Sequence, residues 1–258
     1  MVCNGLFLYT SIEKFKNLKF IQATSVGLDR LPLEYINTNN ITLKTARGVY
    51  SIPMAEWCVS RILDVYKQSE FFFDNQKNKK WIKHRGLTEL NGKTAAIIGA
   101  GDIGTETAKR LYAFGVEVIA VDIVKPVADC YSSYYNIADI SEALGKADIV
   151  IITLPLTEST RNLFNEQTLG FMRNDSILVN MARGGIIDEN ALVNALQNDK
   201  LGCAILDVFE NEPLDEGSNL WKVKNLLITP HNSFVSDRNN ERLFNTICSN
   251  LNSFVGKA

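Results

Sequence analysis

The sequence predicts an α/β fold, with a Rossmann-type doubly wound parallel sheet beside a smaller α/β domain. Short, continuously apolar runs recur along the chain, as in residues 94–98, 149–154 and 177–180. Helical patterns lie between several of these runs, for example over residues 189–197. A glycine-rich turn follows the first of them. Apolar strands that alternate with helices indicate a parallel sheet covered on both faces.

The composition allows one large domain or two modest ones. The chain has 258 residues, of which 46% are hydrophobic and 22% charged, so a packed core needs no disulfides. Its 27 basic and 29 acidic residues nearly balance, which gives no electrostatic case for binding nucleic acid. Basic residues do cluster in residues 77–85, after Glu70 and Asp74. We interpret this stretch as a solvated, partly helical connector rather than a nucleic-acid patch.

The cysteines and the N-terminus exclude several other classes of protein. The five cysteines are scattered and no pair has CxxC spacing, so we expect reduced thiols and no metal site. The apolar stretch at the N-terminus is too short for a signal peptide or a membrane span, and no other run approaches membrane length. We therefore expect a cytoplasmic protein that does not contact a membrane.

The first fifty residues predict a small α/β unit. We expect strands over residues 18–23 and 41–45, with a helix over residues 31–37 between them. A long helix is predicted from Ser51 to Phe73, because serine can cap a helix and Pro53 suits an early helical position. We place the domain boundary close to Ser51.

The remainder of the chain predicts the Rossmann domain, over residues 51–236. A helix over residues 103–114 is expected between strands at residues 94–98 and 116–121. Later strands are expected at residues 149–154, 177–180, 204–208 and 226–229. A final amphipathic helix is predicted over residues 237–254. We expect this C-terminal segment, residues 237–258, to complete the domain formed by residues 1–50.

The glycine turn has the pattern of a dinucleotide site. Gly99 permits a tight turn, Gly101 lets the backbone approach a pyrophosphate, and Gly104 lets helix and strand pack closely. Asp102 and Ile103 complete the turn and open the helix whose N-terminus faces the phosphates. Asp122 stands eighteen residues after Gly104, close to the spacing of an acid that binds the ribose 2′-hydroxyl. A carboxylate also repels a 2′-phosphate, which favours NAD over NADP; a site for another adenosine cofactor is the alternative.

Polar residues past three later strands suit hydride chemistry on a 2-oxo acid. His231 can supply the proton that a developing alkoxide needs, and a carboxylate such as Glu212 would orient its ring. Arg183 can hold a substrate carboxylate with its planar donors. Asp207 could accept a hydrogen bond from the nicotinamide carboxamide. Each has a simpler interpretation, a surface ion pair for the arginine and a capping or core residue for the histidine.

Taken together, these segments resemble the D-isomer-specific 2-hydroxyacid dehydrogenases. The likeness runs from about Leu18 to the last helix and includes GAGDIG with Asp122, LPLTESTRNLFNEQTL, NMARGGIIDENALVNAL, LDVFENEP and TPHNS. The resemblance implies catalytic roles for Arg183, Glu212 and His231. It implies that the loop Ser25-Val26-Gly27 offers backbone N–H groups to the substrate carboxylate. The positions that match cofactor contacts are Ile103, Asp122, Pro155, Ala182 and Asp207.

The resemblance also implies a homodimer and leaves alternatives open. The predicted 51–73 helix and the aromatic segment after it are the candidate contact, with Trp57, Phe71, Phe72, Phe73 and Trp81 as possible anchors. Family members begin with an additional βαβ stretch, so we expect a shortened substrate domain here. An NAD(H)-binding sensor and a degenerate, weakly active member are the alternatives to an active dehydrogenase.

Overall fold

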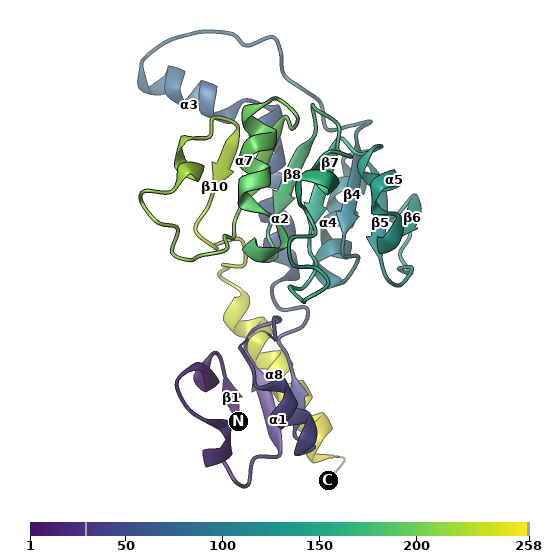
Figure 1. The fold of residues 1–258 in the computed structure, drawn as a ribbon, viewed down its shortest axis with the longest axis vertical. Coiled ribbons are helices and arrows are strands. Elements are labelled where there is room, and N and C mark those ends of the chain that lie inside the picture. Colours follow the sequence, from purple (N-terminus) through teal and green to yellow (C-terminus); the bar gives the residue numbers. More distant parts are fainter. Residues whose placement is uncertain (29, 257–258) are drawn as a thin grey trace. The chain divides into compact units, whose positions relative to one another are not determined.

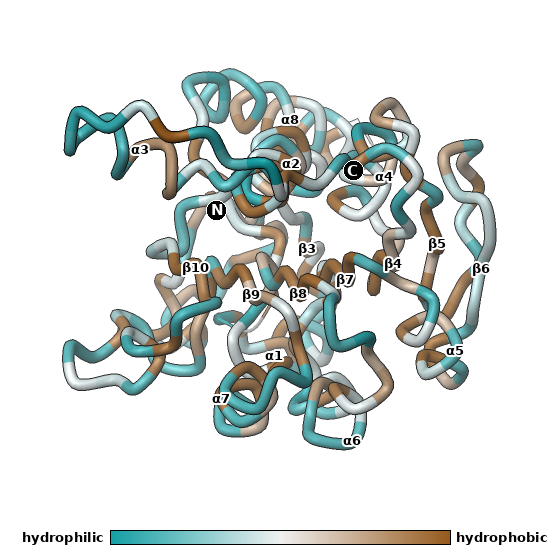
Figure 2. The backbone as a smooth tube through the Cα atoms, turned by 90° about the horizontal axis from the view of Figure 1, so that it is seen from above, coloured by the Kyte–Doolittle hydropathy of each residue, from teal (hydrophilic) through white to brown (hydrophobic). Residues whose placement is uncertain are grey.

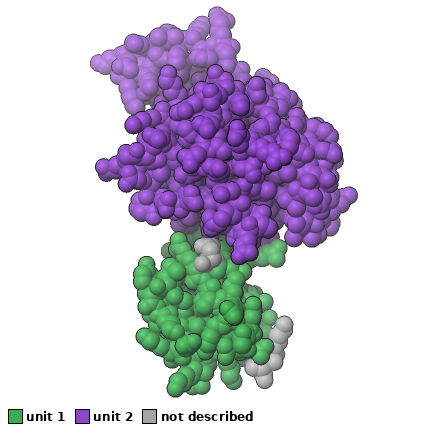
Figure 3. Space-filling model, viewed as in Figure 1, with its two compact units in different colours: residues 1–50, 235–258 green, residues 51–234 purple. Residues whose placement is uncertain are grey.

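The computed structural model of the chain describes residues 1–28 and 30–256. It divides into two compact units, which are coloured separately in Figure 3. Unit 1 comprises Met1–Tyr50 and Val235–Ala258, and unit 2 comprises Ser51–Phe234. The C-terminal segment therefore belongs with the first fifty residues.

Unit 2 is built on a seven-stranded sheet in the order β10-β9-β8-β7-β4-β5-β6 (Figure 1). Every neighbouring pair is parallel, so all the strands end at one edge of the sheet. The strands are β4 (Thr94–Ile98), β5 (Glu117–Asp122), β6 (Ser133–Asn136), β7 (Ile149–Ile152), β8 (Ile177–Asn180), β9 (Cys203–Leu206) and β10 (Leu226–Ile228). The predicted doubly wound parallel sheet is confirmed. Of these seven strands, β6 was the one not predicted, because this edge strand has no apolar run.

Helices cover both faces of this sheet (Figure 2). One face carries α2 (Ser51–Tyr66) and α4 (Asp102–Ala113), and the other carries α5 (Ile140–Leu144), α6 (Glu166–Leu169) and α7 (Glu189–Gln197). Successive strand residues serve opposite faces. Ile97 packs into the cluster beneath α2 and α4, and Ile98 packs into the cluster beneath α5, α6 and α7. Both are fully buried, which explains why β4 is apolar on both of its faces.

The prediction of one helix from Ser51 to Phe73 is wrong. The chain forms α2 and then a separate helix, α3 (Ser69–Lys77), with Gln68 between them in a left-handed conformation at φ 53°. The break comes from a tertiary contact, because the carbonyl of Tyr66 accepts the N–H of Thr88 at 3.1 Å. Lys67 Nζ donates to the Thr88 carbonyl at 2.8 Å in return. No proline or glycine marks this break in the sequence.

Unit 1 holds a smaller parallel sheet in the order β1-β2-β3. Its strands are β1 (Val2–Cys3), β2 (Phe20–Ala23) and β3 (Thr42–Lys44), and its helices are α1 (Leu33–Thr38) and α8 (Asn239–Val255). Its core is a cluster of four buried isoleucines, Ile12, Ile21, Ile36 and Ile41. The last helix packs on β2, where the rings of Phe254 and Phe20 lie 4.9 Å apart. In addition, Asn250 Nδ2 donates to the buried Gln22 Oε1 at 2.8 Å.

Over residues 1–28 and 30–256, no helix has the length and apolar character needed to cross a membrane. In the same residues, no three His, Cys, Asp or Glu side chains gather into a group that could hold a metal ion.

Candidate active site and cofactor site

The glycine turn joins β4 to α4, and its three glycines meet different steric demands. Gly99 has φ 103°, and a Cβ on it would lie 2.9 Å from the backbone N of Leu154. A Cβ on Gly104 would lie 2.2 Å from the Gly99 carbonyl oxygen. A Cβ on Gly101 would meet nothing within 4 Å, so that position faces open space. The first and third glycines let the elements pack closely, and the second leaves an accessible backbone surface.

This open surface lies at the N-terminus of α4, a place suited to a pyrophosphate. Gly101 is the N-cap of α4, and Asp102 and Ile103 form the start of its first turn. The first N–H groups of a helix have no acceptor within the helix and lie at its positive end, so they attract anions. The turn and helix thus fit the diphosphate of a dinucleotide, and their contact with it stays a prediction.

Asp122 lies beside this turn, at the end of β5. Its Oδ2 accepts the N–H of Ala100 and its Oδ1 accepts the N–H of Ile123, each at 2.7 Å. The residue is only partly buried. Since each carboxylate oxygen can accept two hydrogen bonds, both oxygens retain capacity for a further donor. The arrangement fits a pair of ribose hydroxyl groups.

The loops after β8, β9 and β10 carry Arg183, Glu212 and His231. These three strands are in register, with Asn180 opposite Leu206 and Leu206 opposite Ile228, so their loops leave one edge of the sheet. The first two loops touch directly, because a Cβ on Gly184 would lie 1.9 Å from the carbonyl carbon of Phe209. A side chain at residue 184 would therefore force the loop of Arg183 away from the loop of Glu212.

His231 and Glu212 form the central polar pair of these loops. His231 Nδ1 lies 2.7 Å from Glu212 Oε2, and both side chains are 33% exposed. Glu212 is held in turn by the N–H of Phe209, which donates to its Oε1 at 3.1 Å. A carboxylate can only accept, so Nδ1 carries the hydrogen of this bond and Nε2 is left to exchange a proton with a ligand.

Asp207 anchors the loop of His231 through hydrogen bonds. Its side chain is fully buried and accepts the N–H groups of Asn232 and Ser233 at 2.8 and 2.9 Å, as well as the Thr229 hydroxyl. Its carbonyl accepts the N–H of His231 at 2.7 Å. The structure therefore gives Asp207 an anchoring role. A contact with a nicotinamide carboxamide stays a prediction.

Arg183 leaves β8 in an extended conformation, at φ −149° and ψ 142°. The buried Asn180 fixes the backbone there, since its Nδ2 donates to the Arg183 carbonyl at 2.9 Å and its Oδ1 accepts the Ala182 N–H at 3.0 Å. Ala182 itself is 7% exposed. No role was predicted for Asn180, although an amide at the end of an otherwise apolar strand is a signal that the sequence carries.

Pro155 follows β7 in an exposed loop, where its carbonyl accepts the Thr160 hydroxyl at 2.7 Å. Two residues earlier, Thr153 Oγ1 donates to the carbonyl of Gly99 and so links the end of β7 to the glycine turn. No role was predicted for Thr153. A threonine after an apolar strand is too common to indicate such a contact.

The loop Ser25-Val26-Gly27 belongs to unit 1, where it follows β2. Ser25 Oγ donates to the Gly27 carbonyl at 3.2 Å, and the Ser25 carbonyl accepts the Ala46 N–H at 3.0 Å. Val26 is 40% exposed. Neither the Val26 nor the Gly27 N–H donates to another residue in the described part of the chain. Two adjacent N–H groups in an exposed loop fit the carboxylate of a small ligand.

Comparison with known proteins agrees with this geometry. Residues 59–233 match the family model described as D-isomer specific 2-hydroxyacid dehydrogenase, NAD binding domain. The chain is 37% identical to a hydroxypyruvate reductase of Thermotoga maritima over 224 residues, 85% of this chain and 72% of that protein. A D-3-phosphoglycerate dehydrogenase of Methanocaldococcus jannaschii is 36% identical over 85% of this chain and 42% of its own length.

A solved structure shares the fold as well. The D-lactate dehydrogenase of Aquifex aeolicus, complexed with NAD and lactic acid, superposes with a TM-score of 0.84 at 27% identity. The match covers 99% of this chain and 82% of that one. This protein therefore belongs to the family of D-isomer specific 2-hydroxyacid dehydrogenases, and it carries the NAD-binding domain of that family.

Proposed function

We propose that this protein uses NAD(H) to interconvert a small 2-hydroxy acid and its 2-oxo acid, with His231 as the proton donor and acceptor. The observation that carries the proposal is the His231–Glu212 hydrogen bond of 2.7 Å. This pair stands at the sheet edge from which the glycine turn also leaves, because all the strands of unit 2 are parallel. In an open α/β sheet, ligands bind at that edge.

The residues divide the reaction between them. When bound, NADH supplies the hydride that adds to the carbonyl carbon of the 2-oxo acid. His231 gives the proton from Nε2 to the developing alkoxide, and in the reverse direction takes it back. Glu212 fixes the ring through Nδ1 and stabilises its positive charge. Arg183 holds the substrate carboxylate and polarises the carbonyl group.

The cofactor contacts follow the same assignment. We propose that Gly99, Gly101, Asp102, Ile103 and Gly104 form the pyrophosphate site, with Pro155, Ala182 and Asp207 as further contacts implied by the family. Asp122 favours NAD over NADP, because its carboxylate accepts ribose hydroxyl groups and repels a 2′-phosphate. The loop Ser25-Val26-Gly27 offers its two N–H groups to the substrate carboxylate.

We also propose a homodimer. The helix α3 has no buried residue, and the segment around it exposes several large apolar side chains. Phe73 is 61% exposed and Trp81 is 96% exposed. Such side chains are costly to leave in water and often anchor interfaces. Light scattering over a concentration series tests this point. We further propose a cytoplasmic location, because all five cysteines are free thiols.

The enzyme is favoured over a sensor that only binds NAD(H). A binding protein has no need of a histidine whose ring is oriented by a carboxylate, and this chain keeps that pair at 2.7 Å. The arginine expected to hold the substrate carboxylate is also present, on a loop fixed by Asn180.

The test is a substrate screen. The protein is incubated with NADH and, in turn, pyruvate, hydroxypyruvate, glyoxylate, phosphohydroxypyruvate and a branched 2-oxo acid, and the loss of NADH absorbance is followed. We expect turnover of at least one of these acids. Binding of NADH without turnover of any of them would favour the sensor or the degenerate member.

A further inference from the structure

The peptide group between Gly99 and Ala100 is held at both of its ends by side chains. The Gly99 carbonyl accepts the hydroxyl of Thr153. The Ala100 N–H donates to Asp122 Oδ2 at 2.7 Å. The C=O and N–H of a trans peptide point in opposite directions within one plane. A single rigid group therefore connects the end of β7 to the carboxylate at the end of β5.

Thr153 is closely fitted into this arrangement. Its N–H donates to the Ile98 carbonyl at 2.8 Å, which fixes its backbone against the last residue of β4. A Cβ on Gly104 would lie 3.1 Å from Thr153 Oγ1, and a Cβ on Gly99 would lie 2.9 Å from the Thr153 carbonyl carbon. A side chain on Gly104 would thus meet the hydroxyl of Thr153, and a side chain on Gly99 would meet its backbone.

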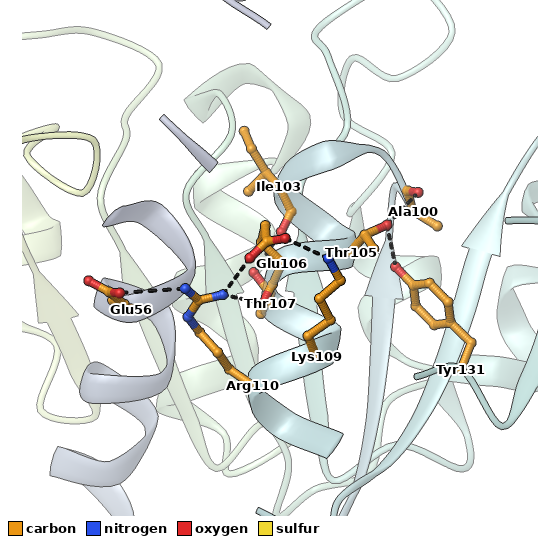
Figure 4. A network of polar contacts seen from close by, with 9 residues as sticks. All are labelled: Glu56, Ala100, Ile103, Thr105, Glu106, Thr107, Lys109, Arg110 and Tyr131. Carbon is orange, nitrogen blue, oxygen red and sulfur yellow. Dashed lines mark hydrogen bonds and ion pairs between the residues drawn. The ribbon is translucent and has the colours of Figure 1, made fainter. Parts of the chain in front are cut away.

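The carbonyl of Ala100 is fixed by two further hydroxyl groups, which are hydrogen-bonded in series (Figure 4). Thr105 Oγ1 donates to this carbonyl at 3.3 Å and lies 3.4 Å from the Tyr131 hydroxyl. Since threonine has one hydroxyl proton, Tyr131 donates to Thr105. Burial raises the pKa of Tyr131 to about 12, so the phenol keeps its proton at neutral pH. The peptide groups before and after Ala100 are therefore both held by side-chain hydrogen bonds.

We propose that Thr153 is a positioning residue for the adenosine ribose of NAD, acting through the Gly99–Ala100 peptide on Asp122. The inference rests on the proposed function, since it assumes that Asp122 binds the ribose. A hydrogen bond to the carbonyl of an amide polarises the amide and strengthens the bond made by its N–H. Thr153 thereby fixes the direction in which Asp122 presents its remaining lone pairs.

Without the hydroxyl of Thr153, the peptide gains freedom to turn and the carboxylate loses that direction. NADH binding then weakens. The ratio of the NADPH Kd to the NADH Kd falls at the same time, because a carboxylate that can turn away repels a 2′-phosphate less. These two changes together distinguish a positioning role from a general loss of stability, which would not alter the preference between the two cofactors.

The experiment measures the Kd of NADH and NADPH by fluorescence titration for three variants. Thr153→Val removes the hydroxyl at nearly constant shape. We expect the NADH Kd to rise about threefold to tenfold, which corresponds to the net free energy of one hydrogen bond. Thr153→Ser restores the hydroxyl, and we expect a Kd close to that of the unchanged protein. Ser176→Ala is the control, because it removes another hydroxyl-to-carbonyl bond of unit 2, to Arg173 at 2.7 Å. Its NADH Kd should not change.

A double-mutant cycle with Asp122→Ala decides whether Thr153 acts through Asp122. If it does, Thr153→Val should weaken NADH binding less than about twofold in the Asp122→Ala background. Full additivity, or no effect of Thr153→Val alone, would overturn the inference while leaving the proposed function intact. An unchanged NADH Kd in Asp122→Ala alone would instead remove the ribose role of Asp122 itself. Turnover of the 2-oxo acid, measured separately, tests the proposed reaction.

Discussion

Two aspartates of unit 2 stand at the carboxyl ends of buried strands, and both hold a turn by accepting backbone N–H groups. Asp122 binds the N–H groups of Ala100 and Ile123, and Asp207 binds those of Asn232 and Ser233. They differ in burial. Asp207 is fully buried, whereas Asp122 is only partly covered.

The difference in burial indicates different roles for the two aspartates. A buried carboxylate is costly unless its hydrogen bonds are made within the protein, and Asp207 makes three of them with its side chain. A partly exposed carboxylate exchanges water for a ligand at little cost. Asp207 therefore serves the loop of His231, and Asp122 is available to a cofactor.

The largest effect that we predict is on stability without ligand. Asp207→Ala removes the acceptor of the Thr229 hydroxyl and of two backbone N–H groups, of which the Ser233 N–H is fully buried, and this costs about 3 kcal/mol or more. Asp122→Ala is the matched control, since it also deprives two N–H groups of an acceptor but leaves them within reach of water. We expect it to cost less than about 1 kcal/mol. Urea unfolding measures both, and equal losses would contradict the distinction.

The second prediction concerns the cofactor. Asp122→Ala removes the acceptor for the ribose hydroxyl groups and the repulsion of a 2′-phosphate. We expect the ratio of the NADPH Kd to the NADH Kd to fall by about tenfold or more, or roughly 1.4 kcal/mol. An unaltered ratio in fluorescence titration would count against binding of the ribose by Asp122.

A third prediction tests the orientation of His231. Glu212→Gln keeps the size of the side chain but removes its charge. We expect turnover of the 2-oxo acid to fall by about tenfold, with the NADH Kd unchanged, because Glu212 contacts the histidine ring and not the pyrophosphate turn. Equal turnover in the two proteins would show that the ring needs no carboxylate.

Much of the fold of unit 2 could be predicted from the sequence. Its buried strands are predominantly apolar, and the structure begins and ends β4, β8 and α7 at the residues that the pattern indicates. The glycine spacing pointed to the turn, and the residues past the strands pointed to Arg183, Glu212 and His231. These features depend on local sequence, or on the fact that the carboxyl ends of parallel strands lie at the same side of the sheet.

Other features depend on contacts that local patterns do not carry. The break between α2 and α3 is set by Thr88, which lies more than twenty residues beyond Tyr66. The burial that separates Asp207 from Asp122 involves the loop after β10, whose Asn232 and Ser233 donate to Asp207, and the local pattern at each aspartate does not carry that contact. The contact of Thr153 with Gly99 likewise joins residues 54 positions apart.

The most direct test of the account is the His231→Gln variant, assayed both for binding and for turnover. Glutamine keeps a polar group but cannot supply the proton, so we predict turnover of the 2-oxo acid lower by about a hundredfold to ten-thousandfold. NADH binding should stay nearly unchanged, since the turn at Gly99 to Gly104 is untouched. Unchanged turnover in this variant would remove His231 from the mechanism and contradict the account.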